Sequence, residues 1–210
     1  MTSAENHTPL EPQARQVLLY WFGDTLEADY PPDDQTHHWF EGGDAVDAHI
    51  RERFGDLVAQ AVDGGLQHWE NDLRHRMALI ILLDQFTRNV YRGEGQAFAG
   101  DERARRLSLR TIDSGEHEQL PRVGRVFLYL PLMHAEDAAL QAQCVALFEA
   151  LVAGAPEPLA TTLSKNVHFA RLHEDIIRRF GRFPYRNAAL GRENTAEEAV
   201  FIKDGPRFGQ

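Results

Sequence analysis

The sequence predicts an all-α protein of about eight helices, stacked as antiparallel hairpins in one domain. Apolar residues recur at three- and four-residue steps through most of the chain, as they do on one face of a helix. No run of alternating apolar and polar residues is bounded by turns in the way that a β-strand requires. Short loops separate the periodic segments, which favours antiparallel neighbours. At 210 residues the chain is long enough to bury one large core without disulfides.

Eight amphipathic segments follow one another, each bounded by residues that start or stop helices. Pro12 suits the first turn of the first helix, and Asp44 suits the N-cap of the second. Thr195 and Glu198 form a capping-box pattern at the start of the last helix. The predicted helices span residues 11–22, 44–63, 72–88, 101–114, 121–133, 136–152, 158–180 and 195–203.

The remaining residues are predicted to form loops and two tails around a single helical domain of residues 10–204. The proline-rich stretch 24–43 favours a loop, which Trp39 and Phe40 are expected to anchor to the core. The predicted flexible tails are residues 1–9 and 205–210.

The helix predicted at 72–88 is the one around which the chain is organised. Within it, the stretch from Leu79 to Leu83 is apolar on every side, which places it in the middle of a core. Asp84 and Arg88 follow four residues apart on one face, so they attract each other. They form either an internal ion pair that tethers the next loop, or a site where Asp84 holds Arg88 with one edge free for an anion. Asn89 and Arg92 lie at or just past the helix end.

A second polar stretch follows the fifth predicted helix. Pro131 removes a backbone donor and must end or kink that helix. His134 comes next, followed by Glu136 and Asp137, and acidic residues at a helix start are expected from the helix dipole alone. As a catalytic group, His134 would act near neutral pH and be oriented by Glu136 or Asp137. Metal binding by Asp84, His134 and Asp137 is a further alternative, but this spacing matches no established metal motif, so no metal is predicted.

Five arginines lie within fifteen residues near the C-terminus, among Phe, Tyr, Pro and Gly; they are Arg178, Arg179, Arg182, Arg186 and Arg192. Aromatic rings and proline hold such a segment rigidly, and guanidinium groups stack on the rings. The segment is interpreted either as an arginine-stapled turn or as a rigid anion cradle that also uses Asn187. His168 and His173 precede it five residues apart, so one is expected to be buried and the other exposed.

The net charge of −10 is unevenly placed along the chain. Residues 1–72 hold 15 acidic and 3 basic side chains, whereas residues 73–210 hold 17 acidic and 19 basic ones. An acidic chain without a basic run argues against nucleic acid as the main partner. Twenty of the 22 basic residues are arginine, which reflects either a GC-rich genome or selection of the planar guanidinium group for carboxylate and phosphate.

The cysteine content and the apolar runs indicate a soluble, cytoplasmic protein. Cys144 stands alone, which favours a reducing compartment, and it falls on an apolar helix face, which favours the core. The N-terminus lacks the basic and apolar segments of a signal peptide. The longest apolar run, residues 77–83, is far shorter than the ~20 residues that span a bilayer. No membrane contact and no cofactor are predicted, and the oligomeric state is left open.

Four stretches carry a resemblance to a known family, in the family's own order: Trp21 to Asp24, Leu83 to Gly93, Tyr129 to Asp137 and Phe180 to Asn187. From about residue 13 to residue 204, the chain resembles the bacterial family catalogued as domain of unknown function 924. The resemblance implies an all-helical fold of the tetratricopeptide-like kind, built of stacked helical hairpins. It implies no established activity, and therefore no catalytic residues.

Two functions are compatible with these features. In the first, the three polar stretches converge on a pocket for a small anionic ligand; an enzymatic version would use His134 and Asp137 as catalytic residues and water as the nucleophile. The ligand-binding residues would be Asp84, Arg88, Asn89, Arg92, Arg182, Arg186 and Asn187. In the second, the same side chains are a structural network in a scaffold that binds a protein or peptide.

Overall fold

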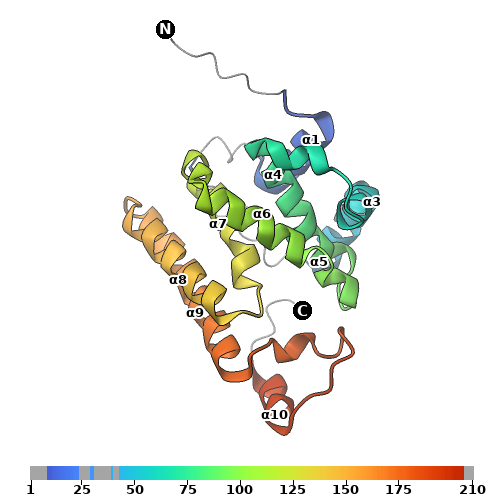
Figure 1. Cartoon of the computed structure of the whole chain (residues 1–210), viewed down its shortest axis with the longest axis vertical. Coiled ribbons are helices and arrows are strands. Elements are labelled where there is room, and N and C mark those ends of the chain that lie inside the picture. The colour runs from blue at the N-terminus through green and yellow to red at the C-terminus, as the bar shows by residue number, and fades with distance from the viewer. Residues whose placement is uncertain (1–8, 24–28, 31–38, 40–42, 206–210) are drawn as a thin grey trace.

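The chain is built of helices joined by short turns in its computed structural model, which describes residues 9–23, 29–30, 39 and 43–205 (Figure 1). These residues include no β-strand, so the predicted all-α class is confirmed. The α-helices are α1 (Pro12–Phe22), α3 (Gly43–Val62), α4 (Leu73–Ile80), α5 (Thr87–Val90), α6 (Asp101–Asp113), α7 (Arg122–Met133), α8 (Ala138–Ala153), α9 (Leu159–Phe180) and α10 (Ala196–Asp204). The tetratricopeptide-like arrangement of hairpins stays a prediction.

The observed helix ends lie within two residues of the predicted ones, apart from the helix predicted at 72–88. That helix is not a single α-helix: α4 continues through a π-helical turn, η3 (Ile81–Phe86), into α5. The hydroxyl of Thr87 donates to the carbonyl of Leu83 inside the π turn at 2.8 Å. Such single π turns change which side chains share a face, and they occur frequently at functional sites.

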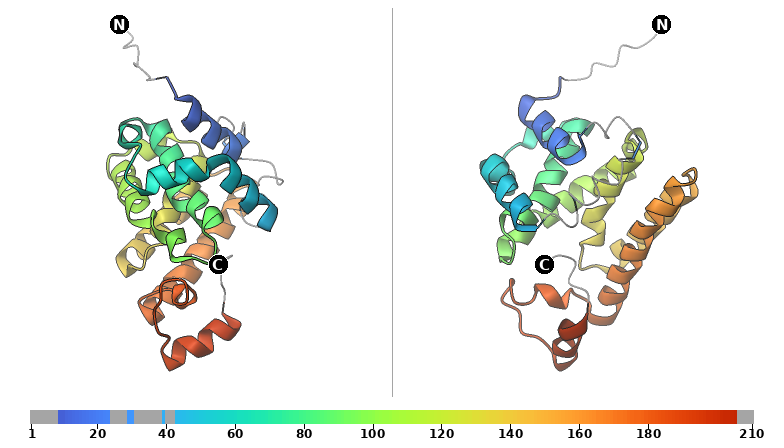
Figure 2. Two further views of the ribbon diagram at one scale, coloured as in Figure 1. Left: turned by 90° about the vertical axis from the view of Figure 1, so that its right-hand side faces the viewer. Right: turned by 180° about the vertical axis from the view of Figure 1, so that it is seen from behind.

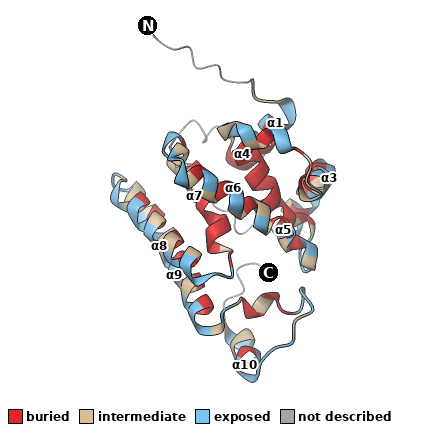
Figure 3. Ribbon diagram, viewed as in Figure 1, coloured by how far each residue is buried: buried red, intermediate tan, exposed pale blue. Residues whose placement is uncertain are grey.

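The continuous helix α4–η3–α5 forms the centre of the molecule. Every residue from His75 to Thr87 is buried, and Figure 3 shows this helix and α7 as the most buried elements of the fold. Helices α1, α3, α6 and α7 surround it (Figure 1). This placement follows from the apolar stretch Met77 to Leu83, because a helix that is apolar on every side is most stable when none of its faces meets water.

Aromatic side chains join α1 to the central helix and to α7. The ring of Trp21 lies 5.4 Å from Phe86 and 5.5 Å from Phe127, in edge-on arrangements. Trp39 is buried, and its indole nitrogen donates to the backbone oxygen of Trp21 at 2.6 Å. The predicted anchoring by Trp39 is therefore confirmed, while Phe40 and most of the loop and tail residues lie outside the described part of the chain.

Helices α8 and α9 form a hairpin that packs beside α7, and Cys144 is buried in it as expected (Figure 2). Helix α7 ends at Met133, two residues after Pro131. The buried amide of Gln141 donates to the backbone oxygens of Met133 and Ala135, at 2.6 and 2.8 Å. These bonds fix the backbone on both sides of His134, so this residue is held in one place.

The chain turns back toward the central helix after α9. Gly181 ends α9 with a φ of +69°, a conformation that favours glycine. A short 3₁₀ helix, η6 (Pro184–Arg186), and α10 follow, at the end of the molecule away from α1 (Figure 2). The capping box of Thr195 and Glu198 is present, as predicted. Among the described residues, no helix is both long enough and apolar enough to cross a membrane.

Candidate functional site

Five charged or titratable side chains from distant parts of the chain meet at the C-terminal end of the central helix. Together they form what we call the central polar cluster, which consists of Asp84, Arg88, Asp101, His134 and Arg186. Asp84 lies in η3 and Arg88 in α5, whereas Asp101 is the first residue of α6. His134 follows the last residue of α7, and Arg186 lies in η6. All but Asp101 were predicted as site residues.

Asp84 is fully buried and has partners on both carboxylate oxygens. Its Oδ1 lies 2.8 Å from Nδ1 of His134, and its Oδ2 accepts from the amide of Gln85 at 2.5 Å. Nη1 of Arg88 lies 3.5 Å from Oδ1 and donates to the backbone oxygen of Asp84. Burial alone would raise the pKa of Asp84, but the neighbouring His134 and Arg88 and these hydrogen bonds hold it below its usual range.

His134 has a lowered pKa and, in its neutral form, a defined tautomer. Burial, above all, lowers its pKa from the usual 6.5, and the charge of Arg88 adds to this against the opposing effect of Asp84. An ionised carboxylate can only accept, so Nδ1 carries the hydrogen that is donated to Asp84. Nε2 then keeps its lone pair, and 16% of the His134 side chain remains exposed. This arrangement suits a proton acceptor.

Arg88 and Arg186 share the carboxylate of Asp101, at 2.9 and 3.4 Å. Burial opposes the charge of Arg88, but Asp101 and Asp84 outweigh it and raise the pKa of Arg88. The opposite holds for Arg186, whose pKa is lowered by burial and by the charge of Arg88. Arg186 is therefore a buried cation whose charge is not fully compensated by the protein.

The guanidinium group of Arg186 lies over two aromatic rings. Its central carbon lies 4.7 Å from the ring centroid of Phe98 and 4.5 Å from that of Phe183. The side chain is 5% exposed, and among the described residues its Nε has no acceptor. The Tyr185 hydroxyl lies near enough to bond the same group. Because a guanidinium group donates its hydrogen bonds in its own plane, a further hydrogen-bond acceptor must meet Arg186 along an edge.

The other predicted ligand residues belong to two separate clusters. Asn89 and Arg92 face α3, where the amide of Asn89 and Nη2 of Arg92 each lie 2.8 Å from Oδ1 of Asp47. Burial would raise the pKa of Asp47, but bonds from these two residues lower it. This pairing fastens the end of the central helix to α3.

Arg182 and Asn187 lie in the C-terminal segment and are bound to α10. Nε and Nη2 of Arg182 donate to the two carboxylate oxygens of Glu198, at 2.7 and 2.8 Å. The amide of Asn187 donates to Asn194 at 2.7 Å. The seven predicted ligand residues thus form three clusters rather than one: Asp84, Arg88 and Arg186 with Asp101; Asn89 and Arg92 with Asp47; and Arg182 and Asn187 with Glu198.

Asp137 and Glu136, the expected partners of His134, have other roles in the structure. Oδ1 of Asp137 accepts from the first backbone amides of α8, at 2.8 and 3.0 Å, and so caps that helix. Glu136 accepts from the backbone of Phe183 at 2.8 Å and from Arg192 at 2.7 Å, which docks the C-terminal segment. Among the described residues, no group of three or more His, Cys, Asp or Glu side chains is placed to hold a metal.

Asp137→Ala is expected to lower the free energy of unfolding by about 1 kcal/mol, the usual cost of losing an N-cap. The central polar cluster keeps its contacts in this variant, because Asp84 rather than Asp137 binds His134. Chemical denaturation of both proteins measures the loss. A loss above about 3 kcal/mol would show that Asp137 does more than cap α8.

Sequence reasoning assigned no site role to Asp101 within the cluster, or to Tyr185 and His173 beside it. Asp101 was assigned to the start of a helix, where an acidic residue needs no further explanation. His173 is buried and His168 exposed, as expected of this pair, and the ring of His173 lies 6.3 Å from that of His134. Its Nδ1 donates to the backbone of Phe169 at 2.8 Å. The sequence does place Tyr185 directly before Arg186, among the aromatic residues of that segment, and this position could have identified it.

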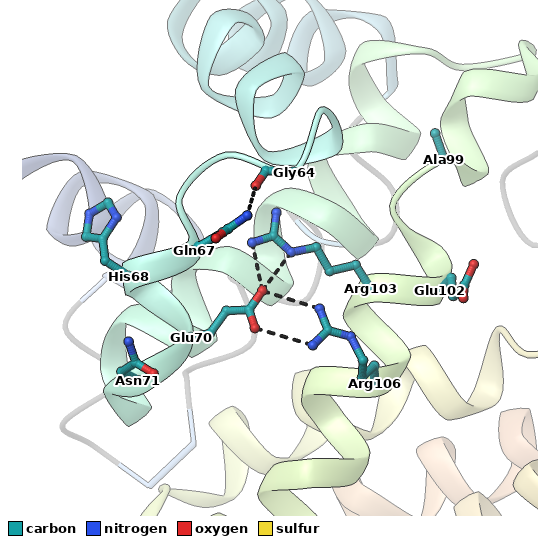
Figure 4. A pocket seen from close by; sticks show the side chains of 9 residues that line it. All are labelled: Gly64, Gln67, His68, Glu70, Asn71, Ala99, Glu102, Arg103 and Arg106. Carbon is teal, nitrogen blue, oxygen red and sulfur yellow. Dashed lines mark hydrogen bonds and ion pairs between the residues drawn. The ribbon is translucent and has the colours of Figure 1, made fainter.

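A polar hollow of about 740 Å³ lies elsewhere, between α6 and the 3₁₀ helix η2 (Gln67–Asn71) (Figure 4). Arg103 and Arg106 both point toward Glu70 in it, at 2.8 and 3.4 Å. Arg103 also donates to two backbone oxygens at the end of α3, those of Ala61 and Gly65. The charged side chains of this hollow are thus paired with one another and with the backbone at the end of α3. Arg186, by contrast, has a buried nitrogen without an acceptor among the described residues.

The chain is similar to proteins without an assigned activity. A family model described as "Bacterial protein of unknown function (DUF924)" matches residues 17–206. A solved structure described as "Structure of Protein of Unknown Function ATU0120 from Agrobacterium tumefaciens" shares 34% sequence identity and a TM-score of 0.73. That match covers 91% of this chain and 97% of the other. No curated protein matches the chain.

Proposed function

Because this chain belongs to the bacterial family DUF924, whose function is unknown, we propose a function from its own side chains: it binds a small anion at the central polar cluster. The ligand class is a carboxylate or phosphate compound, since these are the groups that a planar guanidinium binds along its edge. Arg186 is the principal contact, and Arg88 is the second.

The observation that carries this proposal is the state of Arg186. A cation that is 5% exposed, with Nε lacking an acceptor among the described residues, is costly unless a ligand completes it. Its lowered pKa supports the same conclusion, because burial and Arg88 outweigh the attraction of Tyr185 and Asp101. An anion would supply the missing charge and the missing acceptor together.

Arg76 shows what a purely structural buried arginine looks like in this protein. Its Nε donates to the backbone of Glu70 at 2.9 Å, and its Nη1 lies 2.9 Å from Thr111 and 2.6 Å from Glu116. Among the described residues, none of its buried nitrogens lacks an acceptor. The contrast with Arg186 favours the anion site over the alternative, in which the whole cluster serves only to fix helix ends.

Phosphate, sulfate, acetate and succinate are expected to raise the melting temperature of the wild-type protein above that in chloride of equal ionic strength. At about 100 times Kd, a ligand that binds the folded state alone adds about 2.7 kcal/mol, or about 5–10 °C for a chain of this size. Arg186→Gln should abolish at least nine tenths of that shift, because the edge that meets the anion is removed.

The matched control is Arg171→Gln, which removes one positive charge from an exposed arginine paired with Glu149. This variant should keep the full response to the best anion. If both variants lose the thermal shift equally, the anions bind non-specifically through the net charge of the protein and not at Arg186. If no anion stabilises the wild type, the cluster is a structural network and the proposal is wrong.

A further inference from the structure

The pairing of His134 with Asp84 places a proton acceptor beside the proposed anion site. We propose that this site hydrolyses a small ester or amide that carries a free carboxylate, with His134 as the general base that activates water. The inference rests on the proposed function, because Arg186 must hold the carboxylate of the substrate. It adds a reaction and a substrate class that anion binding alone does not require.

Asp84 and His134 have the geometry of a base and its orienting group. Nδ1 of His134 donates to Oδ1 of Asp84 at 2.8 Å, and the amide of Gln85 holds the other oxygen at 2.5 Å. The carboxylate is therefore fixed, and it keeps the imidazole in the tautomer whose Nε2 can accept a proton. Since 16% of the His134 side chain is exposed, water can reach the ring.

Arg88 is placed to stabilise negative charge that develops next to His134. Its Nη1 lies 3.5 Å from the same Asp84 oxygen that His134 contacts, so the guanidinium and imidazole groups are neighbours. Among the described residues, Nε of Arg88 is buried and has no acceptor. A preorganised donor of this kind lowers the energy of an oxyanion more than that of a neutral carbonyl. Arg186 thus holds the carboxylate of the substrate, while Arg88, the second contact for a simple anion, faces the carbonyl oxygen of the ester or amide.

Water is the nucleophile, because the nearby hydroxyl and thiol groups are engaged elsewhere. The Thr87 hydroxyl donates to the carbonyl of Leu83 at 2.8 Å. Cys144 is buried between α7 and α8, and burial raises the pKa of its thiol. Neither side chain is a reactive nucleophile in this setting.

The reaction balances with water as its single co-reactant. The water oxygen bonds to the carbonyl carbon while one of its protons moves to Nε2 of His134, and the carbonyl electron pair moves onto oxygen beside Arg88. When the tetrahedral intermediate collapses, the bond from carbon to the leaving oxygen or nitrogen breaks. The proton on Nε2 passes to that leaving group, so the products are an acid and an alcohol or amine.

The test uses the full-length protein with two probes, the anionic ester 4-nitrophenyl hemisuccinate and the neutral ester 4-nitrophenyl acetate. The wild type should hydrolyse the hemisuccinate faster than a solution of free imidazole does, when the imidazole concentration equals the total concentration of histidine side chains in the protein sample. His134→Asn should lower kcat about 10²–10⁴-fold, the usual contribution of general-base catalysis, while keeping the anion-induced thermal shift. Arg186→Gln should raise KM for the hemisuccinate by a larger factor than KM for the neutral acetate, because only the hemisuccinate carries the carboxylate that Arg186 holds.

His168→Asn is the control variant, because it removes an exposed histidine from α9 and should retain full activity. The wild-type pH profile offers a second readout that does not depend on the folding of any variant. The value of kcat/KM should rise with pH through one ionisation below the usual histidine pKa of 6.5 and stay level above it, since burial lowers the pKa of His134.

The failures of the two proposals are distinguishable. If anions stabilise the protein but neither ester is hydrolysed above the free-imidazole rate, hydrolysis is excluded and anion binding stands. Full activity in His134→Asn, or a wild-type pH profile that is flat below pH 6.5, also overturns the role of His134. If no anion stabilises the wild type, the site that holds the substrate does not exist and both proposals fall.

Discussion

Asp84→Ala is expected to lower the free energy of unfolding by about 3–5 kcal/mol, the usual cost of breaking a buried charge pair by removing one partner. Asp84 is fully buried at the centre of the protein and accepts from both His134 and Gln85. Its removal leaves these donors without an acceptor and takes one of two carboxylates away from Arg88. Urea denaturation at pH 7 measures the loss.

The pH dependence of this loss provides a direct check of its electrostatic origin. Neighbouring charges and hydrogen bonds outweigh burial and hold the pKa of Asp84 at about 2, against a usual 3.8. A carboxylate with a lowered pKa in the folded protein stabilises it above its unfolded pKa, and this contribution disappears as pH falls through the folded value. The difference between wild type and Asp84→Ala should therefore be constant above about pH 5 and shrink below about pH 4.

A double-mutant cycle that combines Asp84→Ala with His134→Asn measures the interaction free energy between these two side chains. Because the two side chains are in contact at 2.8 Å, the combined loss should fall short of the sum of the single losses by at least about 0.5 kcal/mol. Additive losses would show that Asp84 acts through Gln85 and Arg88 instead.

Gly100→Ala is expected to destabilise the protein by about 3 kcal/mol, the upper end of the usual cost of overpacking, because the new methyl group has no room. A Cβ at Gly100 would lie 2.2 Å from the backbone oxygen of Leu83 and 2.9 Å from its carbonyl carbon and Cα. These are backbone atoms of the π turn, which cannot rotate away as a side chain can. Helix α6 must move away from the central helix, and Asp101 moves with it away from Arg88.

The matched control is Gly55→Ala in the middle of α3, where a Cβ would have no neighbour within 4 Å. There the same change should stabilise the protein by about 0.5–1 kcal/mol, because alanine favours a helix more than glycine does. Thermal and urea denaturation of both variants should show a lower free energy of unfolding for Gly100→Ala and a higher one for Gly55→Ala. A loss at Gly100 of less than about 1 kcal/mol would mean that α6 approaches the π turn less closely than the structure indicates.

The helices could be predicted because their signals are local. The caps of the first and last helices, the glycine after α9 and the proline near the end of α7 act on neighbouring residues, so helix ends were placed within two residues. The π turn could not be predicted in this way. In the structure the backbone of Leu83 lies against Gly100 and its carbonyl accepts from the Thr87 hydroxyl, but the residues of the turn themselves have the sequence of an ordinary buried helix.

The polar stretches were also visible in the sequence, but their partners were not. Asp84 and Arg88 were paired correctly, since four residues on a helix fix their distance. His134 was assigned to Glu136 or Asp137 by proximity along the chain, whereas its partner in space is Asp84, 50 residues away. Asp137 instead meets the amides of its own helix, because a local hydrogen bond forms wherever the backbone offers unpaired donors.

What the sequence determined by itself is the helical fold, the burial of the central helix and the clustering of arginine, aspartate and histidine at helix ends. These follow from periodicity and capping, which are properties of neighbouring residues. The tertiary structure alone decided which carboxylate each arginine meets: Asp47 for Arg92, Asp101 for Arg88 and Arg186, and Glu198 for Arg182. Long-range pairing depends on how whole helices pack, and that packing left Arg186 buried, placed over two aromatic rings and short of acceptors.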